Sequence, residues 1–397
     1  MDTTWVKIPD VLFFQEGPGV RNTQYTEQGV KLLNVANLVD GNVDLSTSDR
    51  YISEEEAYGK YKHFLCDAGD FIVASSGIKV EYIDKKMGFI DKTMLPLCMN
   101  TSTIRFKVLD KSKLNIRYFM YYLKTHHFKD QLAIHITGSA QLNYGPSHLK
   151  KMTMPLIELD KQQEIVSTLD KLQSIITHRR TQLEKLDLLV KARFVEMFGE
   201  PMLNEKGWNM VTIGDIVTEV KYGTSKPAVE GGKYPYLRMN NLTYDGHLDL
   251  TNLKMIDIPD SEIEKCIVHR GDVLFNRTNS IELVGKTCVF DKDEDMVIAG
   301  YIIRVRLKSI MLPIVLSYFM NTDALKKKLR NMAKGAVNQA NINAQEFKSI
   351  NIYLPPIELQ TQFADFVKQV DKSRVAVQKA LDETQLLFDS LMQEYFG

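Results

Sequence analysis

An internal duplication of nearly half the chain constrains the fold more than any other feature of the sequence. The polar element Gly138–Tyr144 recurs as Gly335–Ile342, and each copy is followed by an extended stretch that ends in a proline turn. The turns span Met154–Leu159 and Leu354–Leu359, and a long helical pattern begins at each of them. Because a repeat of this kind encodes one structural unit per copy, we expect two globular units of similar fold, each followed by one long helix.

Weaker matches extend the duplication toward the start of each copy, in the same order. Trp5 matches Trp208, and Asp70 matches Asp272. The first helical pattern ends at Gly199–Pro201, where glycine releases a helix and proline cannot continue it. The predicted division is a first globular unit at 1–156, a central long helix at 157–199, a second globular unit at 200–356 and a C-terminal long helix at 357–397.

The two helical patterns carry a narrow apolar seam of the coiled-coil type. Apolar residues step by four and three along both patterns. Arg179 and Arg374 occupy two of the missing positions, and we interpret them as alignment devices, because a polar residue at a seam weakens a helix pair but fixes its register. The predicted seam consists of Ile165, Leu169, Leu172, Ile176, Leu183, Leu186, Val190, Phe363, Val367, Val370, Val377, Leu381, Phe388 and Leu391.

Each globular unit has the pattern of a mixed α/β fold. Residues 70–74 and 272–276 alternate as strands do, and so do residues 103–108 and 302–307. Short amphipathic helical patterns follow the second pair of strands. We therefore expect an α/β (mixed) fold in both units, with the strand order left open.

Composition excludes several classes of protein. Lysine and arginine total 50, and so do aspartate and glutamate, so the chain has no overall excess of cations for a nucleic acid, although local basic patches are compatible with a neutral total. The four cysteines lie far apart and form no Cys-x-x-Cys pair for zinc or redox chemistry. No segment approaches the ~18 uninterrupted apolar residues of a membrane span. We expect a cytoplasmic protein without a metal site or a membrane segment.

The sequence contains no recognisable catalytic motif. Gly285–Thr287 ends like a phosphate-binding loop, but Ser280 stands where that loop requires its first glycine. Leu354–Ile357 lacks the Asp or Asn and the aromatic residue of an adenine methyltransferase site. We therefore expect no intrinsic catalysis.

The duplicated order of these motifs, with the proline turn at Leu354–Leu359 and the polar element at Asn338–Ile342, resembles the specificity subunits of type I restriction-modification enzymes, the HsdS family. The resemblance covers the whole chain. It implies two target-recognition domains joined by two long helices that pair as an antiparallel coiled coil. Each domain would read one half of an asymmetric, interrupted target in double-stranded DNA.

The same resemblance implies the partners of the chain. Two methyltransferase subunits, which bind S-adenosylmethionine and modify adenine at N6, would dock on the helices. Restriction subunits driven by ATP and Mg would complete a nuclease that defends the cell against foreign DNA. This chain would bind no cofactor itself and would supply only the sequence specificity.

Base reading is expected on loops that carry Arg, Lys, Asn, Gln, Ser and Thr, because these side chains form the hydrogen bonds to base edges. Each candidate is also compatible with a solvated loop or a turn, and the two polar elements are compatible either with phosphate contacts or with tight connections. The candidates of the first copy are Arg21, Gln24, Asn34, Asn37, Ser75, Ser76, Lys79, Ser139, Gln141 and Asn143. The candidates of the second copy are Lys221, Tyr222, Thr224, Lys226, Arg238, Asn240, Asn241, Asn276, Arg277, Thr278, Asn338, Gln339 and Asn341.

Two other interpretations remain open at the level of sequence. The chain could be a coiled-coil scaffold whose globular units bind proteins, which the neutral charge balance favours. It could also serve a methylation-only system or a system with a fused nuclease.

Overall fold

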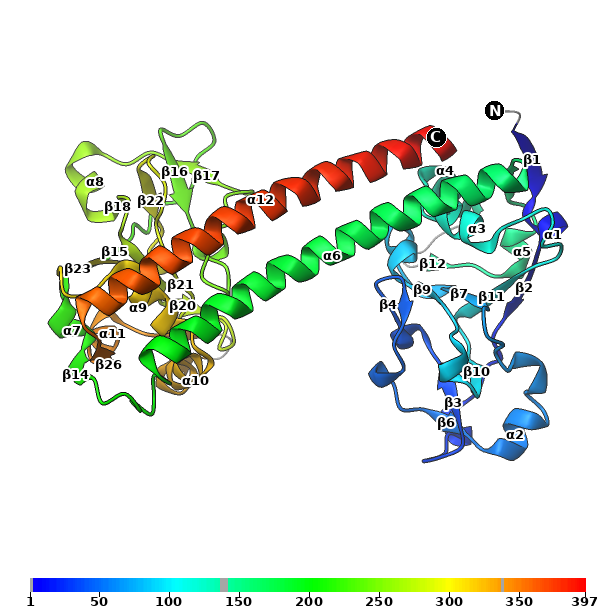
Figure 1. Ribbon diagram of the computed structural model, residues 1–397, viewed down its shortest axis with the longest axis horizontal. Coiled ribbons are helices and arrows are strands. Elements are labelled where there is room, and N and C mark those ends of the chain that lie inside the picture. The colour runs from blue at the N-terminus through cyan, green and yellow to red at the C-terminus, as the bar shows by residue number, and fades with distance from the viewer. Residues whose placement is uncertain (1–2, 136–141, 337–338) are drawn as a thin grey trace. The chain divides into compact units, whose positions relative to one another are not determined.

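The computed structural model describes residues 3–135, 142–336 and 339–397. The chain divides into two compact units (Figure 1). The first consists of Met1–His178 with Ala380–Gly397, and the second consists of Arg179–Lys379. The boundaries lie inside the two long helices, so each unit contains one α/β domain together with one half of each helix.

The long helices are α6 (Leu159–Phe198) and α12 (Ile357–Phe396). They begin within two residues of the starts expected from the proline turns. In the first unit the other elements are β1 (Thr4–Lys7), α1 (Ile8–Val11), β2 (Leu12–Glu16), β3 (Val30–Leu33), β4 (Leu38–Val39), β5 (Asn42–Val43), β6 (Tyr51–Ile52), α2 (Glu54–Tyr58), β7 (Phe71–Ala74), β8 (Ser76–Ile78), β9 (Met87–Phe89), β10 (Leu97–Met99), β11 (Thr103–Val108), α3 (Ile116–Leu123), α4 (His126–His135), β12 (Leu142–Asn143), α5 (Pro146–Leu149) and β13 (Thr153–Leu156).

The second unit repeats this order with small variations. Its elements are β14 (Asn209–Thr212), α7 (Ile213–Ile216), β15 (Val217–Tyr222), β16 (Tyr234–Leu237), β17 (Lys254–Ile256), α8 (Asp260–Cys266), β18 (Ile267–Val268), β19 (Val273–Asn276), β20 (Thr278–Asn279), β21 (Thr287–Val289), β22 (Met296–Ile298), β23 (Ile302–Leu307), α9 (Pro313–Met320), α10 (Asp323–Met332), β24 (Lys334–Ala336), β25 (Gln339–Asn341), α11 (Ala344–Lys348) and β26 (Asn351–Leu354).

The same antiparallel sheet forms the centre of each unit. Its strand order is β2-β11-β7-β9 in the first unit and β15-β23-β19-β21 in the second. Each unit has a second sheet with one parallel pair of strands, which is β3 with β10 in the first unit and β16 with β22 in the second. Every residue of β7 and of β19 is buried, because both faces of these strands are covered. The mixed α/β fold expected from the sequence is confirmed. The two copies also share the order of strands in their central sheets.

A fully buried glutamine fastens the start of each long helix to its α/β domain. In the second unit, Oε1 of Gln360 accepts the N–H of Leu312 at 2.8 Å, and its Nε2 donates to the carbonyl oxygens of Ile310 at 3.0 Å and Pro355 at 2.9 Å. Gln162 makes the three equivalent bonds in the first unit. Both side chains are completely excluded from solvent. Since a buried amide is costly unless its hydrogen bonds are made, this pattern fixes where each helix leaves its domain.

Each domain also inserts a tyrosine against the helices. Tyr318 on α9 lies with its ring 6.3 Å from that of Phe194 on α6 and 5.3 Å from that of Phe363 on α12. In the first unit, the ring of Tyr121 on α3 lies 6.3 Å from that of Phe388 on α12. Burial raises the pKa of the Tyr318 hydroxyl to about 12, so the ring stays neutral at physiological pH.

The helix halves in the second unit run antiparallel to each other. Phe194 of α6 packs against Phe363 of α12, with ring centroids 5.5 Å apart. Further along, the guanidinium of Arg374 donates to Asp187 on the facing helix and to Asp371 on its own helix. The antiparallel pairing of this segment is as expected, and the ion pair agrees with the interpretation of Arg374 as an alignment device.

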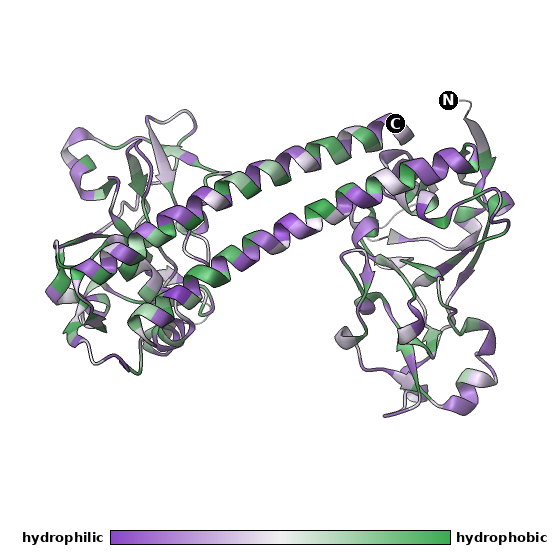
Figure 2. Ribbon diagram, in the orientation of Figure 1, coloured by the Kyte–Doolittle hydropathy of each residue, from purple (hydrophilic) through white to green (hydrophobic). Residues whose placement is uncertain are grey.

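The predicted seam is largely withdrawn from solvent. Figure 2 shows apolar and polar residues alternating along both long helices. The buried members are Ile165, Leu169, Ile176, Val190, Phe363, Val367, Val370, Leu381 and Phe388. The half-buried members are Leu172, Leu183, Leu186, Val377 and Leu391. Other apolar residues of the helices remain exposed, namely Ile175, Leu188, Leu189, Val195, Val375, Leu386 and Leu387.

The buried glutamines generate a prediction about stability. Replacing Gln360 by Leu removes three hydrogen bonds and leaves the N–H of Leu312 and two carbonyl oxygens unpaired in the interior, so we expect the free energy of unfolding of that unit to fall by roughly 2–4 kcal/mol. Gln162→Leu should destabilise the first unit equally. Urea unfolding followed by circular dichroism measures both effects.

The matched control is Gln163→Leu, because Gln163 is the next residue of α6 and is exposed. This variant should unfold within ~0.5 kcal/mol of the unchanged chain. Equal unfolding midpoints for Gln162→Leu and Gln163→Leu would show that the buried amide does not fasten the helix.

Candidate nucleic-acid interface

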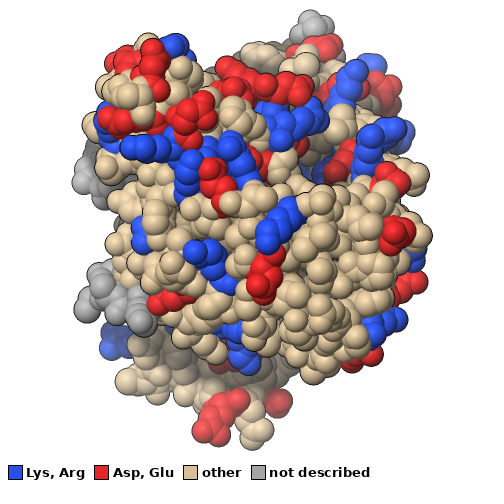
Figure 3. Space-filling view, turned by 90° about the vertical axis from the view of Figure 1, so that its left-hand side faces the viewer, with Lys and Arg blue, Asp and Glu red and all other residues tan. Residues whose placement is uncertain are grey.

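Charged side chains of both signs are mixed on the surface. In the face that Figure 3 shows, lysine and arginine lie among aspartate and glutamate, and large areas carry neither. This face therefore carries no continuous cationic surface, and the surroundings of each candidate residue decide whether it can contact DNA. The described residues include no group of three or more His, Cys, Asp or Glu that could hold a metal ion. No helix in the described ranges is both long and apolar enough to span a membrane.

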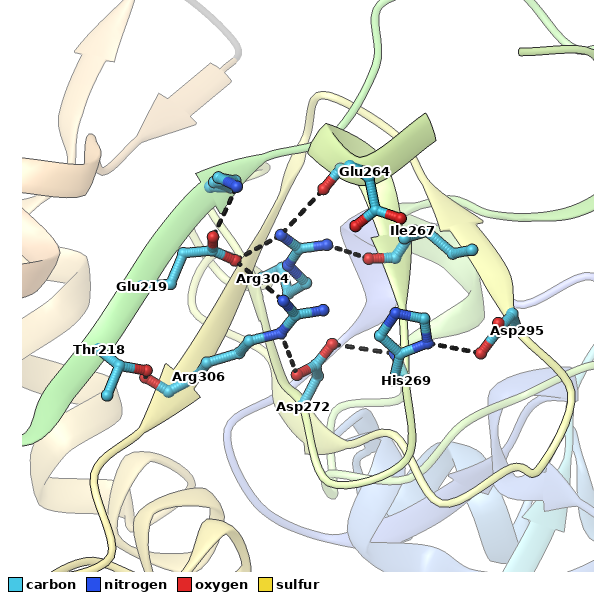
Figure 4. A network of polar contacts seen from close by, with 10 residues as sticks. Thr218, Glu219, Glu264, Ile267, His269, Asp272, Asp295, Arg304 and Arg306 are labelled. Carbon is cyan, nitrogen blue, oxygen red and sulfur yellow. Dashed lines mark hydrogen bonds and ion pairs between the residues drawn. The ribbon is translucent and has the colours of Figure 1, made fainter. Parts of the chain in front are cut away.

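A buried arginine joins the two sheets of the second unit (Figure 4). Arg304 on β23 is fully buried and donates to the carbonyl oxygens of Ile267 and Glu264 and to the carboxylate of Glu219. Burial raises the pKa of the Glu219 carboxyl, but hydrogen bonds from Lys221 and Arg304 outweigh it, and the net shift is downward. Glu219 therefore stays ionised and neutralises both cations.

The first unit contains a buried arginine at the equivalent position, with different side-chain partners. Arg105 on β11 is buried and donates to the carbonyl oxygen of Leu65 at 2.7 Å, to Oδ2 of Asp70 at 3.2 Å and to Oε1 of Gln15 at 2.5 Å. A buried guanidinium needs this many partners to offset the loss of its hydration. The bond from the buried arginine to a backbone carbonyl oxygen is thus duplicated, whereas its side-chain partners differ, with Asp70 in the first unit and Glu219 in the second.

The two copies carry different residue types at the position that follows β7 in the first unit and β19 in the second. The N–H of Ser75 donates to the carbonyl oxygen of Ser102 at 2.7 Å, and the N–H of Arg277 donates to that of Tyr301 at 2.9 Å. Ser75 and Arg277 therefore occupy the same place in the two copies. The first copy has a small buried hydroxyl there, and the second has a cation.

Arg277 lies against the aromatic ring of Tyr222, the last residue of β15. Its guanidinium carbon is 4.8 Å from the ring centroid. The hydroxyl of Tyr222 accepts the N–H of Ala344 at 2.8 Å, which holds the ring in place. Tyr222 is 43% exposed and Arg277 is half-buried, so the pair of side chains reaches the surface. The DNA contacts of both residues stay predictions.

The neighbouring lysines are neutralised. Lys221 lies 2.6 Å from a carboxylate oxygen of Glu219, and Lys226 lies 3.0 Å from one of Glu262. The hydroxyl of Thr224 accepts the N–H of Lys226 at 3.2 Å. These three candidates lie at one edge of the second unit, but the two ammonium groups are already engaged.

Two of the predicted contact residues are buried hydrogen-bonding residues. Oδ1 of Asn241 accepts the N–H of Arg238 at 2.9 Å, and its Nδ2 donates to the carbonyl oxygen of Asp249 at 2.8 Å. Asn37 makes the equivalent bonds in the first unit. The structure revises our interpretation of both residues, because their amides hold a loop together and do not face solvent. Their DNA contacts stay untested predictions.

Three more candidates are occupied in the interior. Nδ2 of Asn276 donates to the carbonyl oxygens of Thr278 and Tyr301, at 3.1 and 3.0 Å. The hydroxyl of Thr278 donates to Oδ1 of Asn341 at 3.0 Å, which joins β20 to β25. Nδ2 of Asn34 donates to the carbonyl oxygen of Leu32 at 3.0 Å. Asn276, Thr278 and Asn34 are buried, so a structural role accounts for them.

Other candidates of the first unit also have internal partners. Nε2 of Gln24 donates to Oε1 of Glu56 at 2.6 Å. The hydroxyl of Ser76 donates to that of Ser102 at 2.6 Å, whereas the buried hydroxyl of Ser75 has no hydrogen-bond partner in the described part of the chain. The side chains of Gln24 and Ser76 are therefore already engaged, and the hydroxyl of Ser75 is buried.

The remaining candidates are spread over the two units. Nη2 of Arg238 donates to the carbonyl oxygen of Asn252 at 3.1 Å. The exposed candidates of the two units are Arg21, Lys79, Asn143, Asn240 and Gln339. Ser139, Gln141 and Asn338 lie outside the described residues.

A basic groove in the first unit contains residues that the sequence analysis did not select. Lys79 lines it together with Tyr82, Lys85 and Lys86, in a volume of about 660 Å³. The ring of Tyr82 is 49% exposed, and Nζ of Lys85 lies 5.5 Å from its centroid. Asp40 also lines the groove. None of the three ammonium groups forms an ion pair with a described residue. The adjacent Lys85 and Lys86, three residues after a tyrosine, were the available sequence signal.

Comparison with known proteins identifies the family. The profile described as type I restriction modification DNA specificity domain matches residues 6–186 and 205–384. The specificity subunit of the type I restriction enzyme EcoKI from Escherichia coli K12 is 24% identical over 299 residues, which are 70% of this chain and 64% of that relative. A putative specificity subunit, MjaX, from Methanocaldococcus jannaschii is 28% identical over 194 residues, 48% of this chain and 45% of that relative. The chain thus spans less than two thirds of the length of these relatives.

Two solved structures share the fold. The S subunit of a type I restriction-modification system from M. genitalium superposes with a TM-score of 0.59 at 15% identity, covering 100% of this chain and 97% of that one. A chain from a structure on the assembly and conformational transition of the type I R-M system gives a TM-score of 0.55 at 18% identity, covering 99% and 96%.

The buried asparagines generate the second prediction. Asn241→Ala removes two internal hydrogen bonds and leaves a buried N–H and a carbonyl oxygen unpaired, so we expect the second unit to lose about 1–3 kcal/mol of stability. Asn240→Ala is the control, because Asn240 is the neighbouring residue and is exposed. Thermal unfolding of the two variants side by side tests this assignment, which fails if Asn240→Ala is the more destabilising change.

Proposed function

Because this chain belongs to the family of type I restriction modification DNA specificity domains, we propose that it is the DNA specificity subunit of a type I restriction-modification enzyme. Each α/β domain reads one half of an asymmetric, interrupted target in double-stranded DNA. The observation that carries the proposal is the pair of domains with the same order of strands in the central sheet and the same bond from a buried arginine to a backbone carbonyl oxygen. The two domains differ at equivalent positions such as Ser75, which is buried, and Arg277, which is half-buried. Similar domains with different side chains would read different bases from similar positions.

The long helices are the proposed docking sites for the methyltransferase subunits, two for each chain. Their exposed apolar residues include Leu188 and Leu189 on α6 and Leu386 and Leu387 on α12. Apolar side chains in such numbers on a helix surface are typical of a protein interface. S-adenosylmethionine, ATP and Mg belong to the methyltransferase and restriction subunits in this proposal, and this chain supplies no catalytic group. The complex acts on DNA in the cytoplasm.

The basic groove of the first unit is the proposed phosphate contact of that domain. Lys79, Lys85 and Lys86 place three unpaired cations at one open groove, and Tyr82 adds an aromatic surface beside them. Phosphate contacts set the position of a protein on DNA without reading the sequence. The carboxylate of Asp40 also lines the groove and repels phosphate, so the proposed phosphate contact is with the three lysines and away from Asp40.

This proposal predicts a change in the salt dependence of DNA binding. The variant with Lys79, Lys85 and Lys86 all changed to Ala should bind DNA more weakly at low salt, and the slope of log affinity against log salt should become shallower by about 2–3, because each phosphate contact contributes ~0.9. The chain in complex with its methyltransferase subunits is titrated into labelled duplex DNA between 50 and 200 mM salt, the range over which such contacts are lost.

The control variant changes Lys111, Lys150 and Lys151 to Ala, since these three lysines of the same unit are also exposed. It carries the same change in net charge and should retain the original slope. A complex whose DNA affinity does not vary with salt would instead support the protein-binding scaffold. Equal slopes for the two triple variants would remove the groove from the DNA interface.

A further inference from the structure

Arg277 differs from the other candidate cations of the second unit, Lys221, Lys226 and Arg238, because its guanidinium lies against the aromatic ring of Tyr222. The backbone of Arg277 is fixed on both sides, since its N–H donates to the carbonyl oxygen of Tyr301 and its own carbonyl oxygen accepts the N–H of Ile342 at 2.9 Å. The side chain therefore starts from a rigid position between β19 and β20, and Tyr222 supports the plane of its guanidinium at 4.8 Å.

The guanidinium of Arg277 also keeps its charge uncompensated. No carboxylate forms an ion pair with it among the described residues, whereas Lys221 and Lys226 each have one. Its recorded hydrogen bond, from Nη1 to the carbonyl oxygen of Gly300, is long at 3.5 Å. Its Nε is buried, and Arg277 as a whole is half-buried. The N–H groups of Nη2 and the second N–H of Nη1 are therefore the donors left for a ligand that presents acceptors at the surface.

The first unit lacks this pair at the equivalent positions. In the central sheet of the second unit, Tyr222 lies opposite Ile303. Ile104 is the residue of the first unit equivalent to Ile303, and it lies opposite Glu16, so Glu16 occupies the place of Tyr222. Arg277 is matched by the buried Ser75. The framework that carries an arginine on an aromatic ring in one copy therefore carries a carboxylate and a hydroxyl in the other.

From this geometry we propose that Arg277 reads a guanine in the half of the target that the second unit recognises. The proposal rests on the proposed function and specifies its chemistry. The two acceptors of guanine in the major groove, O6 and N7, match two parallel N–H donors of a guanidinium, and no other base presents that pair. Tyr222 is a positioning residue, because it holds the guanidinium plane and does not itself contact the base. The first half of the target has no corresponding guanine contact.

The test is the DNA motif that carries N6-methyladenine in cells expressing the chain with its methyltransferase subunits. The unchanged chain should give a two-part motif with an invariant guanine in one half. In Arg277→Ala that single position should accept all four bases, with discrimination falling by about 10-fold or more, while every other position is retained. Arg277→Gln should shift the preference at that position toward adenine, since a carboxamide pairs with N6 and N7 of adenine.

Two further variants separate base reading from other roles. Tyr222→Leu should relax the same position, because the guanidinium loses its support. Arg270→Ala should leave the motif unchanged, since Arg270 is an exposed arginine of the same unit that is paired with Asp293.

The inference is overturned by an unchanged motif in Arg277→Ala. It is also overturned by a uniform loss of methylation at all sites with the same motif, which would indicate a phosphate contact, and by relaxation of positions in both halves. If the unchanged chain directs methylation to no two-part motif, the proposed function itself fails. The failure of the proposed function is thus detected with the unchanged chain, whereas the failure of the inference about Arg277 is detected only with the variants.

Discussion

The structure depends on buried hydrogen bonds that tie each long helix to its own α/β domain. Gln162 and Gln360 each satisfy one N–H and two carbonyl oxygens in a region that water does not reach. Replacing such an amide by an apolar side chain destabilises the unit, because it leaves one N–H and two carbonyl oxygens unpaired. The same three hydrogen bonds therefore fix the direction in which α6 leaves the first domain and α12 leaves the second. The start of each long helix is thereby held in a fixed position on its own domain.

Within that framework the two copies share part of their internal hydrogen bonds and differ at other equivalent positions. Arg105 and Arg304 join the sheets in the same way, and Asn37 and Asn241 hold the same loop. The positions of Ser75 and Arg277 then carry different chemistry on the same backbone. A recognition protein built from two such domains can alter one surface without repacking its core, which is what the reading of an asymmetric target would require.

The sequence predicts the parts of this structure that are periodic or repeated. The seam and the proline turns place α6 and α12 within two residues of their observed starts, and the duplicated order leads to the family. Sequence reasoning cannot tell a buried polar side chain from an exposed one. Asn37, Asn241 and Asn276 have the residue types of base-reading loops, but their partners are backbone groups that only the fold brings near. Tyr82, Lys85 and Lys86 were missed for the converse reason, because the groove they line exists only in the folded domain.

If each domain is fixed to its own helix halves, the two domains should read DNA independently of each other. The most direct test exchanges residues 1–156 for the equivalent domain of another family member, keeps α6 and the second domain, and sequences the methylated adenines in cells that express the hybrid with its methyltransferase subunits. We expect one half of the target to change to that of the donor and the other half to persist. A hybrid that methylates efficiently but changes both halves together would contradict this expectation.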